Sequence, residues 1–263
     1  MFLVTSFFEN LSTYSLDYNS WLICIVSAML FGSAKAGIAG AGMLAVPILA
    51  HIFGGKSSAG IILPMLSMSD IIAVSYYYKE TNWRYVFRIL PGTFLGVLVG
   101  LFVGSIVSDE MFKLLIAIIV IIISAIVIYK DFIRKTPFNV PDRWYFATST
   151  GLLAGFATMI GNASSPIVSL YLISKNLSKN VFVATTAIYF FIVNLSKIPL
   201  HIFVWRTITW QSITLNLALL PAIIIGALLG IFVVKYFPEK IYRNFVIMVT
   251  IISAIVLVID VVR

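Results

Sequence analysis

Two short stretches of glycine, proline and small polar residues interrupt hydrophobic segments of this sequence. They span residues 37–47 and 158–166. Non-helical backbone at membrane depth is tolerated only against protein or water, and proline fits the first turn of a helix. Each stretch therefore predicts that one helix ends and another begins inside the membrane. A helix N-terminus has free N–H groups and a positive dipole end, so two of them together could bind an anion. The residues expected to contact that anion are Lys35, Gly40, Gly42, Gly161, Asn162, Ser164 and Ser165.

Close packing of helices is the alternative interpretation of all these small residues. We accept it for two ladders at helical spacing, which are Gly92, Gly96, Gly100 and Gly104, and Ala222, Gly226 and Gly230. For the two interrupted stretches we prefer a binding role, because Asn162, Ser164 and Ser165 are polar without being needed for packing.

Three charged residues fall inside hydrophobic segments. Lys35 ends the first segment, beside the first interruption, where it could snorkel to an interface or add positive charge to the anion site. Asp70 lies near the middle of its segment and is too short to snorkel, so it must be protonated, paired or facing water. We expect it to couple ion movement or to pair a cation. Lys197 occupies the matching position of the second half and is a candidate partner, although it lies closer to the end of its segment.

The remaining residue types indicate anchoring and no catalysis. His51 and His201 could carry protons, but both lie near segment ends, and we interpret them as interfacial histidines. The tryptophans also gather at segment ends, as membrane anchors do. The sequence has no phosphate-binding glycine loop, no zinc-protease motif and no cysteine pair. We therefore expect no enzyme activity, no cofactor, no metal and no ATP-driven step.

Composition sets the environment in which these residues act. Of the 263 residues, 61% are hydrophobic and only 11% are charged, against about 25% charged in soluble domains, and the mean hydropathy is +1.06. These values exclude a soluble enzyme and a disordered chain, and the single Cys24 excludes a disulfide scaffold. Long apolar runs without strict alternation predict membrane-spanning helices rather than a barrel. The net charge of +8 then indicates basic loops at a cytoplasmic membrane face rather than nucleic-acid binding.

The hydrophobic segments occur in two similar series. They are 20–36, 43–53, 59–78, 89–107 and 112–129, followed by 144–160, 163–173, 181–203, 213–234 and 244–261. Three blocks match in order between the series. The first pairs Gly32, Gly42 and Pro47 with Gly151, Gly161 and Pro166, and the second pairs Ser69 to Ile71 and Trp83 with Ser196 to Ile198 and Trp210. The third pairs Pro91, Gly96 and Gly100 with Pro221, Gly226 and Gly230. The order of the blocks indicates a duplication.

Positive charges predict how the two series lie in the membrane. Residues 20–53 are too few for two full crossings and a turn at about 1.5 Å per residue, but they suffice for a re-entrant hairpin. With three further spans per half, one side carries Lys79, Arg84, Arg88, Lys130, Arg134, Lys135, Arg143, Lys175, Lys179, Lys235, Lys240 and Arg243, and the other carries Lys56, Lys113, Arg206 and Arg263. The positive-inside rule makes the richer side cytoplasmic and both termini extracytoplasmic.

This topology inverts the second half relative to the first, which is an architecture of secondary transporters. The expected fold is an all-α integral membrane domain of about eight to ten helical segments, each repeat being a re-entrant hairpin plus three transmembrane helices. Its parts are an extracytoplasmic segment (1–19), a first repeat (20–129), a cytoplasmic linker (130–143) and a second repeat (144–263).

The interruption that ends in Gly42 to Pro47, its repetition at Gly161 to Pro166, and the helix of Pro91 and Gly92 with its glycine ladder resemble the TauE/SafE sulfite exporter family. The resemblance covers residues 22–262. It implies a small transporter of the cell (inner) membrane that moves sulfite or another sulfur-containing organic anion.

From the residues and the resemblance together we expect a secondary transporter, and more specifically an exporter, whose substrate is held at the two interruptions. Proton coupling through Asp70 is a further hypothesis. The alternatives are a passive anion channel and an accessory membrane subunit without transport activity of its own. The expected partners are a small anion and the lipid bilayer, with no nucleic acid, and the glycine ladder leaves room for helix pairing in a homodimer.

Overall fold

The computed structural model is helical throughout the residues that it describes, which are 11–38, 41–112, 114–115, 118–119, 122, 143–238 and 241. The main helices are α2 (Tyr18–Ala36), α3 (Ala45–Phe53), α4 (Gly55–Tyr77), α5 (Trp83–Ile106), α7 (Trp144–Gly161), α8 (Ser165–Ile173), α9 (Lys179–Pro199) and α10 (Trp210–Tyr236). Three short turns, η1 (Ala41–Leu44), η2 (Tyr78–Glu80) and η4 (Leu200–Val204), precede α3 or extend α4 and α9. The predicted all-α fold is confirmed.

Five helical stretches among the described residues are long and apolar enough to cross a membrane. They are Tyr18–Ala36, Gly55–Glu80, Trp83–Ile106, Lys179–Val204 and Trp210–Tyr236. Most of the expected segment 112–129, all of 244–261, the linker except Arg143, and Gly40 lie outside the described residues. The division of the chain into segment, repeats and linker stays a prediction.

Local sequence explains where the helices begin and end. The Asp17 side chain caps α2 by accepting a hydrogen bond from the Ser20 N–H at 3.1 Å. Gly37 ends α2 with a φ of 152°, which favours glycine, and Asn162 ends α7 in the left-handed region with a φ of 51°. Pro166 lies in the first turn of α8. Short non-α-helical pieces thus separate α2 from α3 and α7 from α8.

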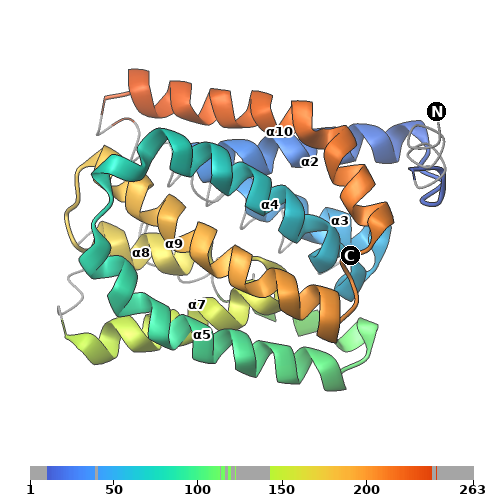
Figure 1. Ribbon diagram of the computed structural model, residues 1–263, viewed down its shortest axis with the longest axis horizontal. Coiled ribbons are helices and arrows are strands. Elements are labelled where there is room, and N and C mark those ends of the chain that lie inside the picture. Colours follow the sequence, from blue (N-terminus) through green and yellow to red (C-terminus); the bar gives the residue numbers. More distant parts are fainter. Residues whose placement is uncertain are drawn as a thin grey trace.

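The same order of helices, one long, one short and two long, occurs twice in the described chain, as α2 to α5 and as α7 to α10. Helix α2 packs along α10 at one edge of the molecule and α5 packs along α7 at the other, with α4 and α9 between them (Figure 1). The first helix of each half therefore packs on the last described helix of the other half.

Glycines set the close approach within both edge pairs. A Cβ atom at Gly96 would overlap the carbonyl oxygen of Leu152, and one at Gly226 would overlap that of Met29. Gly32 faces the α10 backbone in the same way. The packing role expected of the ladders is therefore seen within the chain. These glycines are occupied by intrachain contacts, so they lend no support to a homodimer, which stays a prediction.

Helices α4 and α9 run antiparallel at the centre. The Asn82 N–H, after the end of α4, donates to Thr185 Oγ1 near the start of α9 at 3.0 Å, whereas Gly60 near the start of α4 lies against Thr207 beyond the end of α9. These two helices hold matching positions in the two halves. An inverted duplication requires this antiparallel arrangement, and the inversion itself stays a prediction.

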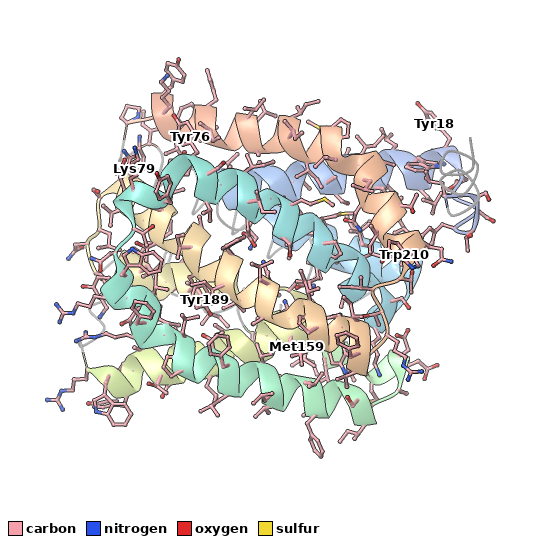
Figure 2. All side chains as sticks on the ribbon, in the orientation of Figure 1. Tyr18, Tyr76, Lys79, Met159, Tyr189 and Trp210 are labelled. Atoms are coloured by element: carbon pink, nitrogen blue, oxygen red, sulfur yellow. The ribbon has the colours of Figure 1, made fainter. Side chains whose placement is uncertain are left out.

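Basic residues gather at one end of the molecule. Tyr76 and Lys79 lie at this end, which we call the lysine-rich end, and Tyr18 and Trp210 lie at the opposite end (Figure 2). The helix ends found there carry Lys79, Arg84, Arg88, Arg143, Lys175, Lys179 and Lys235, whereas Lys56 and Arg206 belong to the opposite end. This asymmetry supports the predicted orientation, in which the lysine-rich end faces the cytoplasm.

Replacing Gly96 by alanine should destabilise the α5–α7 pair, although alanine is the better helix former. The added Cβ would overlap Leu152 backbone, and overpacking of this kind should lower the Tm of the purified protein by about 5 °C in a thermal unfolding assay. The matched control is Leu95→Ala on the outward face of the same helix, where 54% of the leucine is exposed. An unchanged Tm for Gly96→Ala would contradict the packing role.

Candidate functional site

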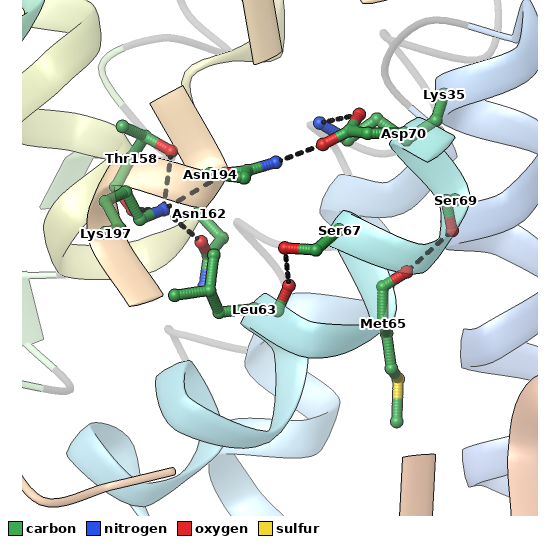
Figure 3. Close-up of polar contacts among 10 residues, drawn as sticks. All are labelled: Lys35, Leu63, Met65, Ser67, Ser69, Asp70, Thr158, Asn162, Asn194 and Lys197. Atoms are coloured by element: carbon green, nitrogen blue, oxygen red, sulfur yellow. Dashed lines mark hydrogen bonds and ion pairs between the residues drawn. The ribbon is translucent and has the colours of Figure 1, made fainter. Parts of the chain in front are cut away.

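A buried chain of polar contacts crosses the centre of the molecule between the two halves (Figure 3). Lys35 Nζ of α2 lies 3.0 Å from Asp70 Oδ1 of α4. Asn194 Nδ2 of α9 donates to the other carboxylate oxygen, Asp70 Oδ2, at 2.6 Å. On its other side, Asn194 Oδ1 accepts from Lys197 Nζ at 3.4 Å. We call these four residues, together with the Thr158 and Asn162 groups that Lys197 contacts, the charge network.

Lys197 binds the end of α7. Its ammonium donates to the Thr158 carbonyl oxygen at 2.8 Å, to Thr158 Oγ1 at 3.0 Å and to Asn162 Oδ1 at 2.7 Å. The C-terminal end of a helix has unpaired carbonyls and a negative dipole end, which favour a cation. The Asn162 amide in turn donates to the Ala59 carbonyl of α4 at 3.4 Å. Lys197 therefore holds the interruption between α7 and α8 against α4 and α9.

Lys35 has a different environment at the end of α2. Its ammonium lies 3.9 Å from the centroid of the Phe190 ring, in a cation–π contact, besides its ion pair with Asp70. The Lys35 side chain is 10% exposed, whereas Asp70 and Lys197 are fully buried. Lys35 does not snorkel to an interface but stays in the protein interior.

The charge network has more positive than negative charge. It contains two lysines and one aspartate, so full ionisation leaves an excess of one positive charge. A buried charge without a partner is costly, and more so within a membrane. Lys197 spreads its charge over carbonyl, hydroxyl and amide oxygens. With all three groups ionised, the network as a whole would favour the approach of an anion.

A small cavity of about 30 Å³ adjoins the charge network. Its polar wall includes Lys35, Gly42, Asn162, Ser165 and Asn194. Its apolar wall includes Phe31, Leu66 and Phe190. These residues come from α2, η1 and α4 in the first half and from the α7–α8 interruption, α8 and α9 in the second. We call it the central cavity. It has room for about one water molecule, so a larger anion needs the walls to move apart.

The sequence matches a known protein family. A family model described as Sulfite exporter TauE/SafE matches residues 24–257. The chain belongs to this family. No curated protein and no solved structure matched the sequence. Membership in the TauE/SafE family makes the chain a multi-pass membrane protein of a transport family rather than an enzyme family, and it implies an exporter role for sulfite or a related sulfur anion.

In this family member the predicted anion-contacting residues fall into three groups. Those that line the central cavity are Lys35, Gly42, Asn162 and Ser165. Ser164 is fully buried just before α8, and its hydroxyl has no hydrogen-bond partner among the described residues. Gly161 is the buried last residue of α7, and Gly40 lies outside the described residues.

The structure also shows which group each charged residue inside a hydrophobic segment contacts. Asp70 pairs with Lys35, and Lys197 reaches it only through Asn194. Sequence analysis missed Asn194, although its position three residues before Lys197 places both on one face of α9. His201 is fully buried in η4 with Nδ1 2.8 Å from Thr207 Oγ1, and its interpretation as an interfacial residue stays a prediction. His51, in the last turn of α3, is exposed as expected.

Breaking the Lys35–Asp70 pair from one side should cost more than removing both charges. Lys35→Met leaves the Asp70 carboxylate without its cation, so we expect a loss of about 3 kcal/mol in unfolding free energy. The double variant Lys35→Met/Asp70→Asn should recover a large part of this loss, because its amide still accepts from Asn194. Thermal and denaturant unfolding of the two single variants and the double variant would measure the coupling. Lys79→Met, at an exposed lysine, is the control, and additive effects would contradict the pair.

Proposed function

We propose that this TauE/SafE family member is a secondary transporter that exports sulfite or a small organosulfur anion through the central cavity. The observation that carries the proposal is the buried network of two lysines and one aspartate beside a cavity whose walls come from both halves. A permanent protein anion at this place would neutralise the excess positive charge that full ionisation leaves. A transported anion does so only while it is bound, which suits a site that must also release it.

Within the site, Lys35 is the group that we expect to contact the anion. An ammonium has three N–H donors, and that of Lys35 pairs with Asp70 at 3.0 Å while the side chain lines the cavity. Lys197, in contrast, directs its donors at Thr158 and Asn162. We therefore assign substrate contact to Lys35 and the positioning of Asn162 to Lys197.

The second half contributes the start of α8. Ser165 is the first residue of this nine-residue helix and lines the cavity, and the buried Ser164 hydroxyl precedes it without a partner among the described residues. The first N–H groups of a helix have no intrahelical acceptor and form an anion site. An oxyanion bound there would accept from the α8 N-terminus and from Lys35 at the same time.

Transport then requires the walls of the central cavity to move apart. The central cavity is too small for sulfite in the conformation described, and its walls belong to both halves. Rocking of the part that contains the α2–α10 pair against the part that contains the α5–α7 pair would open it alternately to each side. The edge pairs α2–α10 and α5–α7 are held by backbone-to-backbone glycine contacts, so we expect the movement along the α4–α9 seam, where the charge network lies.

Asp70 gives this site a means of coupling to protons. An anion that draws Lys35 towards itself leaves the Asp70 carboxylate without its counter-charge. A buried acid in that situation favours its protonated form. Substrate binding and proton uptake would thus be linked through a single lysine.

Flux of labelled sulfite into proteoliposomes tests the proposed function. Wild-type protein should move sulfite, whereas Lys35→Gln should lower kcat/KM at least about tenfold, as expected for the loss of a charge-assisted contact. Lys79→Gln is the matched control, and size-exclusion chromatography checks that both variants fold. Sulfate and alkyl sulfonates under the same conditions define the substrate class. Absence of any flux from the purified chain would contradict the proposal and favour an accessory subunit.

Asp70→Asn should separate proton coupling from substrate exchange. The amide keeps an acceptor for Asn194 but cannot exchange a proton, so gradient-driven sulfite flux should fall towards the undriven rate while sulfite–sulfite exchange persists. Both rates are measured in the same vesicles with and without a pH gradient. Driven flux equal to wild type would remove Asp70 from the mechanism. A wild-type flux that ignores the gradient would indicate a passive channel.

A further inference from the structure

A tryptophan of the second half packs into the first half at the end opposite the lysine-rich end. Trp205 directly follows η4 and is only 9% exposed. Its indole N–H donates to Ser105 Oγ of α5 at 3.0 Å, and its ring makes a T-shaped contact with Phe112, with the ring centroids 5.4 Å apart. A Cβ atom at Gly104 would overlap the indole, so the glycine leaves room for it. We call Trp205 and these three contact residues the tryptophan plug.

The tryptophan plug reaches the start of α4 across the seam between α4 and α9. The Trp205 ring makes a second T-shaped contact with His201, whose Nδ1 lies 2.8 Å from Thr207 Oγ1. Thr207 packs against α4 where a Cβ atom on Gly60 would lie. The Lys56 ammonium of α4 lies 6.0 Å from the centroid of the Trp205 ring. A layer of packed side chains therefore joins α4, α5 and α9 at this end.

This layer lies between the central cavity and the opposite end. Leu66 of α4 and Asn194 of α9 line the central cavity. Gly60 precedes Leu66 in α4, which begins at the opposite end, and His201 follows Asn194 beyond α9, which ends there. A path from the central cavity to this end therefore has to pass the layer that contains Trp205.

The repeated blocks of the sequence give the plug a counterpart at the lysine-rich end. Extended at their own spacings, these blocks match Trp205 with Tyr78, Gly104 with Val234 and Ser105 with Lys235. Tyr78 begins η2 at the end of α4, much as Trp205 follows η4 at the end of α9. Turns that depart from α-helical geometry often mark hinges. Tyr76 and Lys79 on either side of Tyr78 lie at the lysine-rich end, whereas Trp210 lies at the other (Figure 2).

Tyr78 does not fill its end of the molecule as Trp205 does. Its side chain is 50% exposed, and Val234 and Lys235 line a cavity of about 420 Å³ instead of an aromatic ring. We call it the end cavity. A cavity of about 150 Å³ already accommodates benzene, so the end cavity has room for a tyrosine ring. Asn180 Nδ2, which donates to the Glu80 carboxylate at 3.2 Å, keeps α9 close to η2 beside this cavity.

We propose that Trp205 and Tyr78 are a matched pair of gates that close the two ends of the transporter in turn. In the conformation described, Trp205 closes the opposite end. In the other conformation Trp205 leaves Gly104, and Tyr78 enters the end cavity against Val234 and closes the lysine-rich end. This inference rests on the proposed function and on the predicted inversion. Because one ring enters as the other leaves, the central cavity is never open to both sides at once, as alternating access requires.

Distances between spin labels at both ends test the gates without any substrate. In a Cys24→Ala background, one pair of labels replaces the exposed residues Ser57 and Phe203 at the opposite end, and a second pair replaces the exposed residues Ser75 and Ser178 at the lysine-rich end. Trp205→Ala removes packing that only one conformation has, so the ratio of the two conformations should change at least about tenfold. The distance at the opposite end should lengthen and the distance at the lysine-rich end should shorten.

Conservative variants distinguish a gate from a residue that only stabilises the fold. Trp205→Phe keeps a ring against Gly104 and should leave both distances close to those of wild type. Trp210→Ala, at a tryptophan of the same end that is 76% exposed, is the matched control. A change confined to the opposite end in Trp205→Ala, or no change at either end, would overturn the proposal.

Sulfite flux into proteoliposomes tests the second gate. Tyr78 is half exposed, so Tyr78→Ala should fold normally, yet it should lower the maximal rate of flux at least about tenfold because the lysine-rich end can no longer close. Tyr78→Phe should keep the wild-type rate. Flux that is unaffected by Tyr78→Ala would overturn the gates and leave the proposed function intact. Opposite changes of the two label distances without any sulfite flux would support the gates and contradict the proposed function.

Discussion

The structure depends on the compensation of charge in a medium that cannot solvate it. Lys35, Asp70 and Lys197 lie inside the membrane domain, and each is stabilised by different contacts. Lys35 has an ion pair and a cation–π contact, and Asp70 has the same ion pair and an amide hydrogen bond. Lys197 has a set of oxygen acceptors. Each of these contacts needs groups from another helix. The pairing of these charges therefore determines how α2, α4, α7 and α9 meet. Lys35, whose charge has the fewest polar partners of the three, lies beside the cavity.

The outer helices provide the rigid frame for this centre. Glycines let α2 approach α10, and α5 approach α7, until backbone touches backbone, which leaves little freedom within either pair. Between them, the contact of α4 with α9 includes the hydrogen bond from Asn194 to Asp70. Hydrogen bonds of this kind can be exchanged for others at small net cost, whereas interlocked backbones cannot separate without leaving voids. The frame and the seam thus have different mechanical roles.

Much of this arrangement could be predicted from sequence, but the partners of the charges could not. Glycine, proline and asparagine act locally, so the ends of α2 and α7 and the start of α8 follow from Gly37, Asn162 and Pro166. The partner of Asp70 depends on whether α4 faces α2 or α9 at that depth, which no local signal encodes. The burial of His201 could not be predicted either, because it depends on its contacts with Thr207 and Trp205 in the folded chain.

The matching positions Asp70 and Lys197 show how the predicted duplication would lead to an asymmetric centre. In the second half, Lys197 binds the carbonyl end of α7 itself, since a cation suits the negative end of a helix. In the first half an aspartate at that place would be repelled by the end of α2, and Lys35 in the last turn of that helix supplies the missing cation. One half is thereby fastened by hydrogen bonds to backbone and side-chain oxygens. The other is held by an ion pair whose lysine also borders the cavity, where the anion of the proposed function would compete for it. In this way Lys35, the lysine that could change its partner, belongs to one half, and Lys197, the lysine that supports the end of α7, belongs to the other.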